Sequence, residues 1–361
     1  MSGSVRGDEG GAAMTENAAA VRSVPGASAV ALTEAYDTAL LDLDGVVYAG
    51  PHAIGHAVES LDRARAAGMR LAYVTNNASR PPRVVAEHLT ELGVPAEPAD
   101  VINSAQAAAR LVAEKVPAGS RVLVIGGAGL LEALEERGLV PVRSLEDDPA
   151  AVVQGYDPSV GWADLAEASY AVGRGLPWVA SNTDLSIPTA RGIAPGNGTL
   201  VAAVRAATGA VPEVAGKPLP PMHRETVLRT GAKRPLVVGD RLDTDIEGAF
   251  NGGVDSLLVF TGVATPEQVL AAPVQHRPTF LAEDLRGLLE AQPEVAAAGG
   301  GRFGCGGWTA GADGGVLVLD GAGTRIDALR ALCAAAWTWA DAHDGAAPES
   351  AKALAGLPAA E

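Results

Sequence analysis

The sequence contains little cysteine and no long hydrophobic run. Its two cysteines, Cys305 and Cys333, match neither a metal-binding spacing nor a disulfide framework. We therefore expect an intracellular, cytoplasmic protein. No apolar run reaches the roughly 18 residues that a transmembrane helix needs. Acidic Asp8, Glu9 and Glu16 interrupt the N-terminal segment, where a signal peptide would require an apolar core.

Basic residues are scarce relative to acidic ones. Lys and Arg total 27 against 43 Asp and Glu, which gives a formal net charge of −16. A surface this acidic repels nucleic acids and anionic membranes, so neither is expected as a partner. It would also repel phosphate esters. An anionic substrate would therefore need a metal ion or a single Lys or Arg placed in a cleft.

Aromatic residues make up only 4% of the chain, whereas hydrophobic residues reach 48%. This composition favours tightly packed α/β layers over an all-β sandwich. From residue 38 onwards, short apolar runs alternate with segments of helical period. That rhythm predicts an α/β fold with a Rossmann-like parallel sheet covered by helices on both faces.

The rhythm restarts within the chain, which predicts an insertion. Residues 36–116 and 212–290 are expected to form one core, because apolar strands resume at Pro235–Gly239. Residues 117–211 carry a strand–helix pattern of their own, beginning with Arg121–Ile125, and are predicted to be an inserted α/β cap.

The ends of the chain are predicted to be less regular. We expect a disordered leader over 1–35, in which Met14 is an alternative translation start to Met1. We expect an Ala/Gly-rich linker at 291–301. A small α+β module at 302–345 is expected to dock on the main body or on a partner, and a flexible tail to follow at 346–361.

Two carboxylates follow the first predicted strand, in the run Leu41-Asp42-Leu43-Asp44-Gly45. In open α/β sheets, ligands bind beyond the carboxyl ends of the strands. Two like charges this close are costly without a cation, and Mg²⁺ prefers such oxygen ligands. The alternatives are a solvated loop or a Ca²⁺ loop. An EF-hand is excluded because Val46 occupies its fifth position.

Two other strand ends carry polar residues. Asp240 follows Pro235–Gly239 and could share a metal with Asp42, whereas Asp243 and Asp245 could either serve the metal or cap a helix. Thr75-Asn76-Asn77 follows another apolar strand; it could hold phosphate oxygens or form an Asn turn.

Lys217 lies in Gly216-Lys217-Pro218, on a loop that its neighbours constrain. A surface lysine is the ordinary interpretation of such a residue. In a chain this acidic, however, Lys217 could supply the cation that an anionic substrate needs.

Together, these four motifs resemble those of the haloacid dehalogenase (HAD) superfamily, in order and spacing. Asp-x-Asp-Gly, Thr-Asn-Asn, Gly-Lys-Pro and Gly-Asp-Arg-x-x-Thr-Asp match the subgroup with a C2-type α/β cap between the second and third motifs. That subgroup contains the 4-nitrophenyl, pyridoxal phosphate and phosphoglycolate phosphatases. The resemblance covers roughly residues 36–290. It implies a Mg²⁺-dependent phosphatase that acts on a small phosphate ester.

The resemblance also implies a catalytic and a metal-binding set. Asp42 corresponds to the nucleophile that becomes an aspartyl-phosphate, and Asp44 to the acid/base. Asp240 corresponds to the third metal ligand, beside the Asp42 carboxylate and the Asp44 backbone carbonyl.

Further matched positions have supporting roles in the family. Thr75, Asn76 and Lys217 correspond to groups that hold the phosphoryl group. Asp245, with Asp243 beside it, corresponds to the position that supports the water shell of the metal.

The cap is expected to select the leaving group. Asn182 and Asp184 correspond to a loop that reaches the active site in relatives, although an Asn/Asp turn is the alternative. The whole chain resembles the actinobacterial glycerol-3-phosphate phosphatases, so glycerol 3-phosphate is the expected substrate; phosphoglycolate, pyridoxal phosphate and aryl phosphates stay open. Relatives often dimerise through this cap, so the resemblance implies a homodimer for this chain as well.

Two segments suggest other functions. Residues 316–342 resemble part of an acetyltransferase, but the Arg/Gln-x-x-Gly-x-Gly pattern is absent, so no acetyl transfer is expected. The run Val124–Leu131 resembles half of a dinucleotide fingerprint, with Glu132 in place of its third glycine. A regulatory or binding protein on a phosphatase scaffold should lack at least one motif residue, and all are present.

Overall fold

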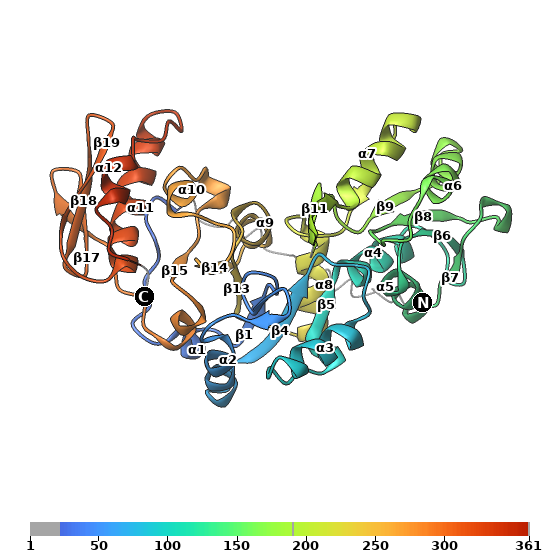
Figure 1. The fold of residues 1–361 in the computed structure, drawn as a ribbon, viewed down its shortest axis with the longest axis horizontal. Helices are drawn as coiled ribbons and strands as arrows, with labels where there is room; N and C mark the ends of the chain where they lie inside the picture. Colours follow the sequence, from blue (N-terminus) through green and yellow to red (C-terminus); the bar gives the residue numbers. More distant parts are fainter. Residues whose placement is uncertain (1–21, 190, 360–361) are drawn as a thin grey trace, which may run out of the picture.

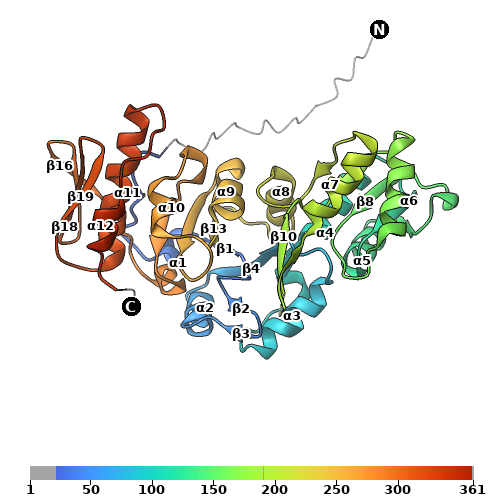
Figure 2. The same ribbon diagram turned by 45° about the horizontal axis from the view of Figure 1, so that its top comes forward.

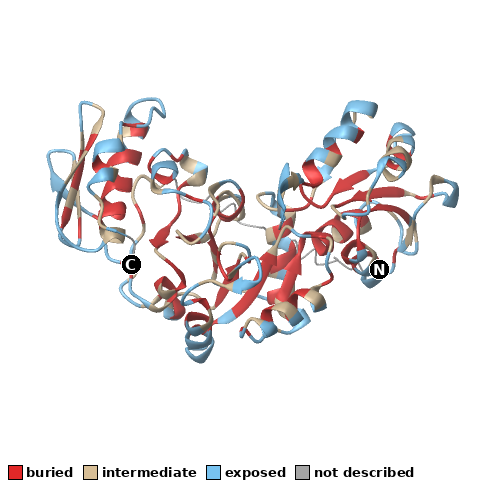
Figure 3. Cartoon of the chain, in the orientation of Figure 1, coloured by how far each residue is buried: buried red, intermediate tan, exposed pale blue. Residues whose placement is uncertain are grey.

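The computed structural model describes residues 22–189 and 191–359 and contains three bodies side by side (Figure 1). A central six-stranded sheet lies between a five-stranded sheet and a four-stranded sheet near the C-terminus. Buried positions follow the strands and the long C-terminal helix (Figure 3). The predicted α/β class, with an inserted cap and a C-terminal appendage, is confirmed. No helix in the described ranges is long and apolar enough to cross a membrane.

The central sheet is parallel, with the strand order β15-β14-β13-β1-β4-β5. Helices α2 (Ala57–Ala66) and α3 (Pro82–Glu91) pack on one face, and α4 (Ser104–Ala113) and α8 (Pro220–Thr230) pack on the other. Alternate strand residues therefore enter two separate apolar clusters. The six strands are Thr38–Leu41 (β1), Arg70–Thr75 (β4), Val101–Asn103 (β5), Pro235–Gly239 (β13), Asp255–Val259 (β14) and Phe280–Ala282 (β15).

The second sheet is also parallel and is inserted between α4 and α8, with the order β12-β9-β8-β6-β7. Its strands are Arg121–Ile125 (β6), Val140–Val142 (β7), Ala151–Gln154 (β8), Trp178–Ala180 (β9) and Glu213–Val214 (β12). Helix α5 (Ala128–Glu136) covers one face; α6 (Trp162–Gly173) and α7 (Asn197–Thr208) cover the other. The sheet thus extends beyond residue 211, the predicted end of the cap.

A hairpin of β10 (Ser186–Thr189) and β11 (Gly192–Pro195) projects from this body toward α3 and α8 (Figure 2). Helix α4 joins the cap to the core. Leu40 of the central sheet, Ala108 of α4 and Leu130 of α5 belong to one buried cluster. The cap is therefore packed onto the core rather than only tethered to it.

The predicted disordered leader over 1–35 is wrong for residues 22–35; residues 1–21 lie outside the described part of the chain. Leu32, in α1 (Leu32–Ala35), is fully buried. The Gly26 N–H donates to the Thr279 carbonyl oxygen at 2.7 Å, and Ser28 pairs with Gln292. These partners are distant in sequence, so no local pattern revealed them.

The C-terminal module, residues 296–359, is an antiparallel sheet, two helices and the segments that join them. Its elements are β16 (Ala296–Gly299), β17 (Arg302–Cys305), β18 (Trp308–Asp313), β19 (Val316–Gly321), α11 (Arg325–Ala342) and α12 (Ala351–Ala355). Helix α11 lies between this sheet and the central body (Figure 1).

Two predicted boundaries are wrong at this end of the chain. The predicted linker over 291–301 contains β16, and the predicted flexible tail over 346–361 is ordered as far as residue 359. The Leu317 N–H donates to the Glu349 carbonyl oxygen at 2.8 Å, and Ala353 of α12 is buried. The tail is ordered because it pairs with β19 and packs onto the module.

Candidate active site

Three carboxylates converge at the carboxyl edge of the central sheet. Asp42 follows β1 and Asp240 follows β13, and these two strands pair directly. Asp245 lies one turn beyond Asp240, in the π-helical turn Leu242–Ile246. One oxygen from each of the three side chains lies within 4.8 Å of the other two. The proximity expected for Asp42 and Asp240 is thus present, and Asp245 joins them.

Asp240 has the environment of a metal ligand. Its side chain is fully buried; Oδ2 accepts a hydrogen bond from the Val263 N–H at 2.7 Å, and Oδ1 has no partner among the described residues. Burial and the neighbouring charge of Asp245 raise the pKa of Asp240 to about 6. A buried, unpaired carboxylate oxygen beside two further carboxylates fits a hard divalent cation.

Two glycines make room for the Asp240 carboxylate. A Cβ on Gly45 would come within 2.4 Å of Oδ2, and a Cβ on Gly262 within 1.9 Å. Neither position can carry a larger residue without displacing this side chain. Gly45 belongs to the Asp-x-Asp-Gly motif, which explains why that motif ends in glycine.

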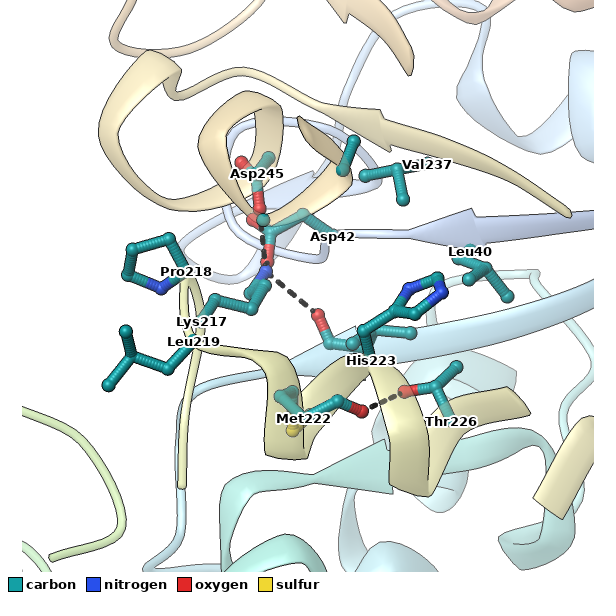
Figure 4. A pocket seen from close by; sticks show the side chains of 13 residues that line it. Leu40, Asp42, Lys217, Pro218, Leu219, Met222, His223, Thr226, Val237 and Asp245 are labelled. Carbon is teal, nitrogen blue, oxygen red and sulfur yellow. Dashed lines mark hydrogen bonds and ion pairs between the residues drawn. The ribbon is translucent and has the colours of Figure 1, made fainter. Parts of the chain in front are cut away.

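Lys217 neutralises part of this acidic cluster. Its Nζ donates to Asp42 Oδ1 at 2.5 Å, to Asp245 Oδ1 at 2.7 Å and to the Val74 carbonyl oxygen at 3.1 Å (Figure 4). Burial raises the pKa of Asp42 and the Lys217 ammonium opposes that rise. The two carboxylates outweigh the burial of Lys217 and raise the pKa of its ammonium, so this group stays charged.

A cavity of about 390 Å³, open to solvent, lies beside Lys217 (Figure 4). Its walls come from α8, α9 (Glu247–Gly252) and the central sheet, and they are mostly apolar. Low-dielectric surroundings strengthen an ion pair that they enclose. The Lys217 and Asp42 side chains are themselves only 11% and 14% exposed, so their ion pair is largely enclosed by protein.

Asn76 positions Lys217. The Lys217 backbone N–H donates to Asn76 Oδ1 at 2.8 Å, and Asn76 Nδ2 donates to the Lys217 carbonyl oxygen at 3.1 Å. Both polar atoms of this predicted phosphate-binding side chain are thus engaged. Thr75, at the end of β4, accepts from the Asn77 N–H at 3.1 Å, which leaves its hydroxyl hydrogen available to a phosphate oxygen.

Asp44 lies exposed at the rim, two residues after Asp42. Nearby protein atoms restrict the hydration of its carboxyl and raise its pKa, while Arg80 and His88 act in the opposite direction. A raised pKa favours a carboxyl group that must deliver a proton near neutral pH.

The two acidic residues after Asp240 lie in different environments. Asp245 is buried, and its Oδ2 accepts from the Arg241 N–H at 3.2 Å. Asp243 points to solvent and forms a two-point ion pair with the Arg241 guanidinium. Asp243 is therefore outside the carboxylate cluster, which favours the non-metal alternative for this residue.

The predicted cap residues contact the loop that follows β4, residues 76–80, which we call the core loop. Asn182 Nδ2 donates to the Asn76 carbonyl oxygen at 2.8 Å, and its Oδ1 accepts from the Asp184 N–H at 3.1 Å. Asp184 accepts from Asn76 Nδ2 at 3.3 Å, and its burial raises its pKa. Asn182 therefore holds the loop, while Asp184 faces the site.

Two residues that the sequence did not indicate also support this arrangement. Ser104 Oγ donates to the Asn76 carbonyl oxygen at 2.6 Å, and Asn197 Nδ2 donates to the Asn182 carbonyl oxygen at 2.7 Å. Ser104 directly follows β5, a strand that the sequence did not predict. Recognising that strand would have identified Ser104 as another polar residue at the same sheet edge.

In the run Val124–Leu131, which resembles a dinucleotide fingerprint, Gly129 packs against the backbone of residues 78–80. The Gly129 N–H donates to the Ser79 carbonyl oxygen at 3.2 Å, and a Cβ on Gly129 would lie 2.3 Å from the Ala78 carbonyl oxygen. The core loop fills the space beside this turn. The run therefore serves contact between cap and core.

Two family models match the body of the chain. Residues 39–140 match the haloacid dehalogenase-like hydrolases, and residues 214–288 match a second model described as HAD-hydrolase-like. Residues 305–358 match a GCN5-related N-acetyltransferase-like domain.

Two curated phosphatases match long stretches of the chain. The chain is 46% identical to the D-glycerol 3-phosphate phosphatase of Mycobacterium tuberculosis over 315 residues, 85% of this chain and 87% of the relative. It is 38% identical to the acid sugar phosphatase of Staphylococcus aureus over 252 residues, 69% of this chain and 95% of the relative. The chain belongs to the haloacid dehalogenase-like hydrolase family and is an enzyme.

Solved structures agree with this assignment. The M. tuberculosis glycerol phosphate phosphatase in complex with magnesium has a TM-score of 0.80 at 44% identity, covering 86% of this chain and 92% of that one. The 4-nitrophenylphosphatase of Thermotoga maritima has a TM-score of 0.66 at 28% identity, covering 72% and 98%. The M. tuberculosis structure therefore matches a larger share of this chain than the T. maritima structure does.

Proposed function

We propose that this enzyme is a Mg²⁺-dependent phosphatase that hydrolyses glycerol 3-phosphate to glycerol and phosphate. The observation that carries the proposal is the cluster of Asp42, Asp240 and Asp245, in which Asp240 Oδ1 has no partner among the described residues and Lys217 bridges the other two carboxylates. Such a site can hold a metal and a phosphoryl group together despite the acidic surface.

Asp42 is proposed as the nucleophile. Its carboxylate would attack phosphorus in line, form an aspartyl-phosphate and release the alcohol, which divides one difficult displacement into two steps. Lys217 would hold Asp42 in place and offset charge on the phosphoryl oxygens, while Thr75 donates a hydrogen bond to them. A bound Mg²⁺, held by Asp42, Asp240 and the Asp44 carbonyl, would supply further positive charge against these oxygens.

Asp44 is proposed as the acid/base. It would protonate the departing alkoxide and then accept a proton from the water that hydrolyses the aspartyl-phosphate. Catalysis of this kind contributes roughly 10²–10⁴-fold. The exposed rim position and raised pKa of Asp44 support this assignment.

The choice of glycerol 3-phosphate is supported by the M. tuberculosis relative, which aligns over 85% of this chain. Asp184, which faces the site from the cap, could accept hydrogen bonds from the hydroxyl groups of glycerol. Phosphoglycolate, pyridoxal phosphate and aryl phosphates are the alternative substrates. We further propose a cytoplasmic enzyme that forms homodimers through its cap.

Phosphate release should be measured with Mg²⁺ across glycerol 3-phosphate and the alternative substrates, at equal concentrations. The proposal expects the highest kcat/KM for glycerol 3-phosphate and loss of activity with excess EDTA. A preference for another ester would overturn the substrate, and full activity in EDTA would overturn the metal requirement.

A further inference from the structure

Residues 260–264 form a loop that holds the metal-ligating Asp240. Besides the Val263 contact with Oδ2, the Ala264 N–H donates to the Asp240 carbonyl oxygen at 2.9 Å. On the other side, Thr261 Oγ1 donates to the Gly45 carbonyl oxygen at 2.6 Å. The direction of the Asp240 carboxylate therefore depends on the position of this loop.

The C-terminal module contacts the first residue of the loop. Arg325, the first residue of α11, places its guanidinium carbon 5.7 Å from the centroid of the Phe260 ring. Arg325 Nη1 also forms an ion pair with Glu283 Oε2 at 2.5 Å, and both side chains are largely buried. The Phe260 N–H bonds to the carbonyl oxygens of Ala282 and Glu283. Phe260 is thus held between a residue of the module and the segment after β15.

The module also holds the segment that leaves the loop. Trp337 of α11 is fully buried, and its Nε1 donates to the Val269 carbonyl oxygen at 2.9 Å, in α10 (Pro266–Leu270). Ala264 and Leu270 belong to the same buried cluster as Trp337. The loop is therefore anchored to the module just before and just after the residues that contact Asp240.

We propose that the C-terminal module supports the metal site indirectly, because it positions the loop that orients Asp240. The affinity of the enzyme for Mg²⁺ then depends on Arg325 and Trp337, although neither residue belongs to the carboxylate cluster of Asp42, Asp240 and Asp245. Groups that orient a metal ligand typically change metal affinity by roughly 10–100-fold when they are removed. This inference rests on the proposed function for the identity of the metal.

The test compares the full-length wild type with Arg325→Ala and a control, Arg302→Ala. Arg302 belongs to the same module, but its ion pairs with described residues stay within its own sheet, with Asp313 and Asp320. Mg²⁺ is titrated calorimetrically without substrate, and the Mg²⁺ dependence of phosphate release is measured in parallel. Arg325→Ala should raise the Mg²⁺ Kd by about 10-fold or more, with kcat at saturating Mg²⁺ close to wild type. Arg302→Ala should match the wild type in both assays.

Two further variants guard against loss of folding. Arg325→Lys keeps the positive charge near Phe260 and Glu283 and should restore much of the affinity. Trp337→Phe keeps an aromatic ring but removes the donor to Val269, and should also weaken Mg²⁺ binding. Wild-type Mg²⁺ affinity in a folded Arg325→Ala protein, or an equal loss in Arg302→Ala, would overturn the proposal. Because calorimetry requires no turnover, absence of phosphatase activity would count against the proposed function alone.

Discussion

Asn76 and Lys217 hold each other by two reciprocal hydrogen bonds, although they are 141 residues apart. Asn76 follows β4 of the central sheet, whereas Lys217 precedes α8 after the whole cap has been inserted. The pair fixes the backbone from which the Lys217 side chain reaches Asp42. Asn76 thereby connects the Thr-Asn-Asn motif to the Gly-Lys-Pro motif.

Asn76→Ala should therefore lower phosphatase activity without unfolding the enzyme. Release of the Lys217 backbone would misplace its ammonium, and a displacement of about 1 Å can cost roughly 10²-fold in rate. Steady-state kinetics and thermal melting would measure the two effects. The control is Asn77→Ala, because Asn77 is exposed and, within the described part of the chain, its side chain bonds to Ser79 of its own turn. Equal activity in both variants would contradict the positioning role.

Asp42→Asn should abolish turnover while the fold survives. The amide has nearly the same shape as the carboxylate and can still accept the hydrogen bond from Lys217, but it cannot attack phosphorus. Acid quenching followed by peptide mass spectrometry should detect a phosphorylated Asp42 peptide in the wild type and none in the variant. Full activity of Asp42→Asn would refute the nucleophile assignment.

Asp44→Asn should affect substrates according to their leaving groups. Glycerol needs a proton as it departs, so this variant should lose roughly 10²–10⁴-fold in the first step with glycerol 3-phosphate. 4-Nitrophenolate leaves without protonation, so its rapid burst with 4-nitrophenyl phosphate should persist. Stopped-flow comparison of the two esters measures the difference. An equal loss of the first step with both would argue against Asp44 as the acid.

Glu225 is expected to make stability depend on pH. Its side chain on α8 is fully buried and pairs with Arg110 on α4, Arg137 beyond α5 and Arg229 on α8. Burial alone would raise the pKa of Glu225, but the arginines outweigh it and hold this pKa below its usual value. The resulting stabilisation is fully present above the unfolded Glu pKa of about 4.3, and is lost as pH falls through the lower folded value.

Glu225→Gln should therefore lower the free energy of unfolding near neutral pH by about 3 kcal/mol and flatten its decline in acid. Denaturant titrations across the acid range measure both changes. Glu136→Gln is the matched control, because Glu136 also pairs with Arg229 but is exposed, and exposed pairs contribute about 1 kcal/mol or less. Equal effects of the two substitutions would show that the burial of Glu225 is unimportant.

Local patterns predicted much of the fold. The strands over 121–125 and 235–239 have the predicted bounds. Gly126 follows the first strand, and the second begins at Pro235 and ends at Gly239, so their limits are set by glycine and proline. The ordered segment 22–35 has no such signal, because contacts with residues such as Thr279 and Gln292 order it.

By itself, the sequence determined the four motifs, their order around an insertion and the α/β class, because strand ends, turns and apolar periods are local properties. Tertiary structure decided how the side chains are used. In the folded chain Asp243 points to solvent, Asn182 bonds to the core loop and Arg325 lies against Phe260. The last two arrangements bring together residues that are distant in the chain, so they arise only when the sheets, the cap and the C-terminal module pack together.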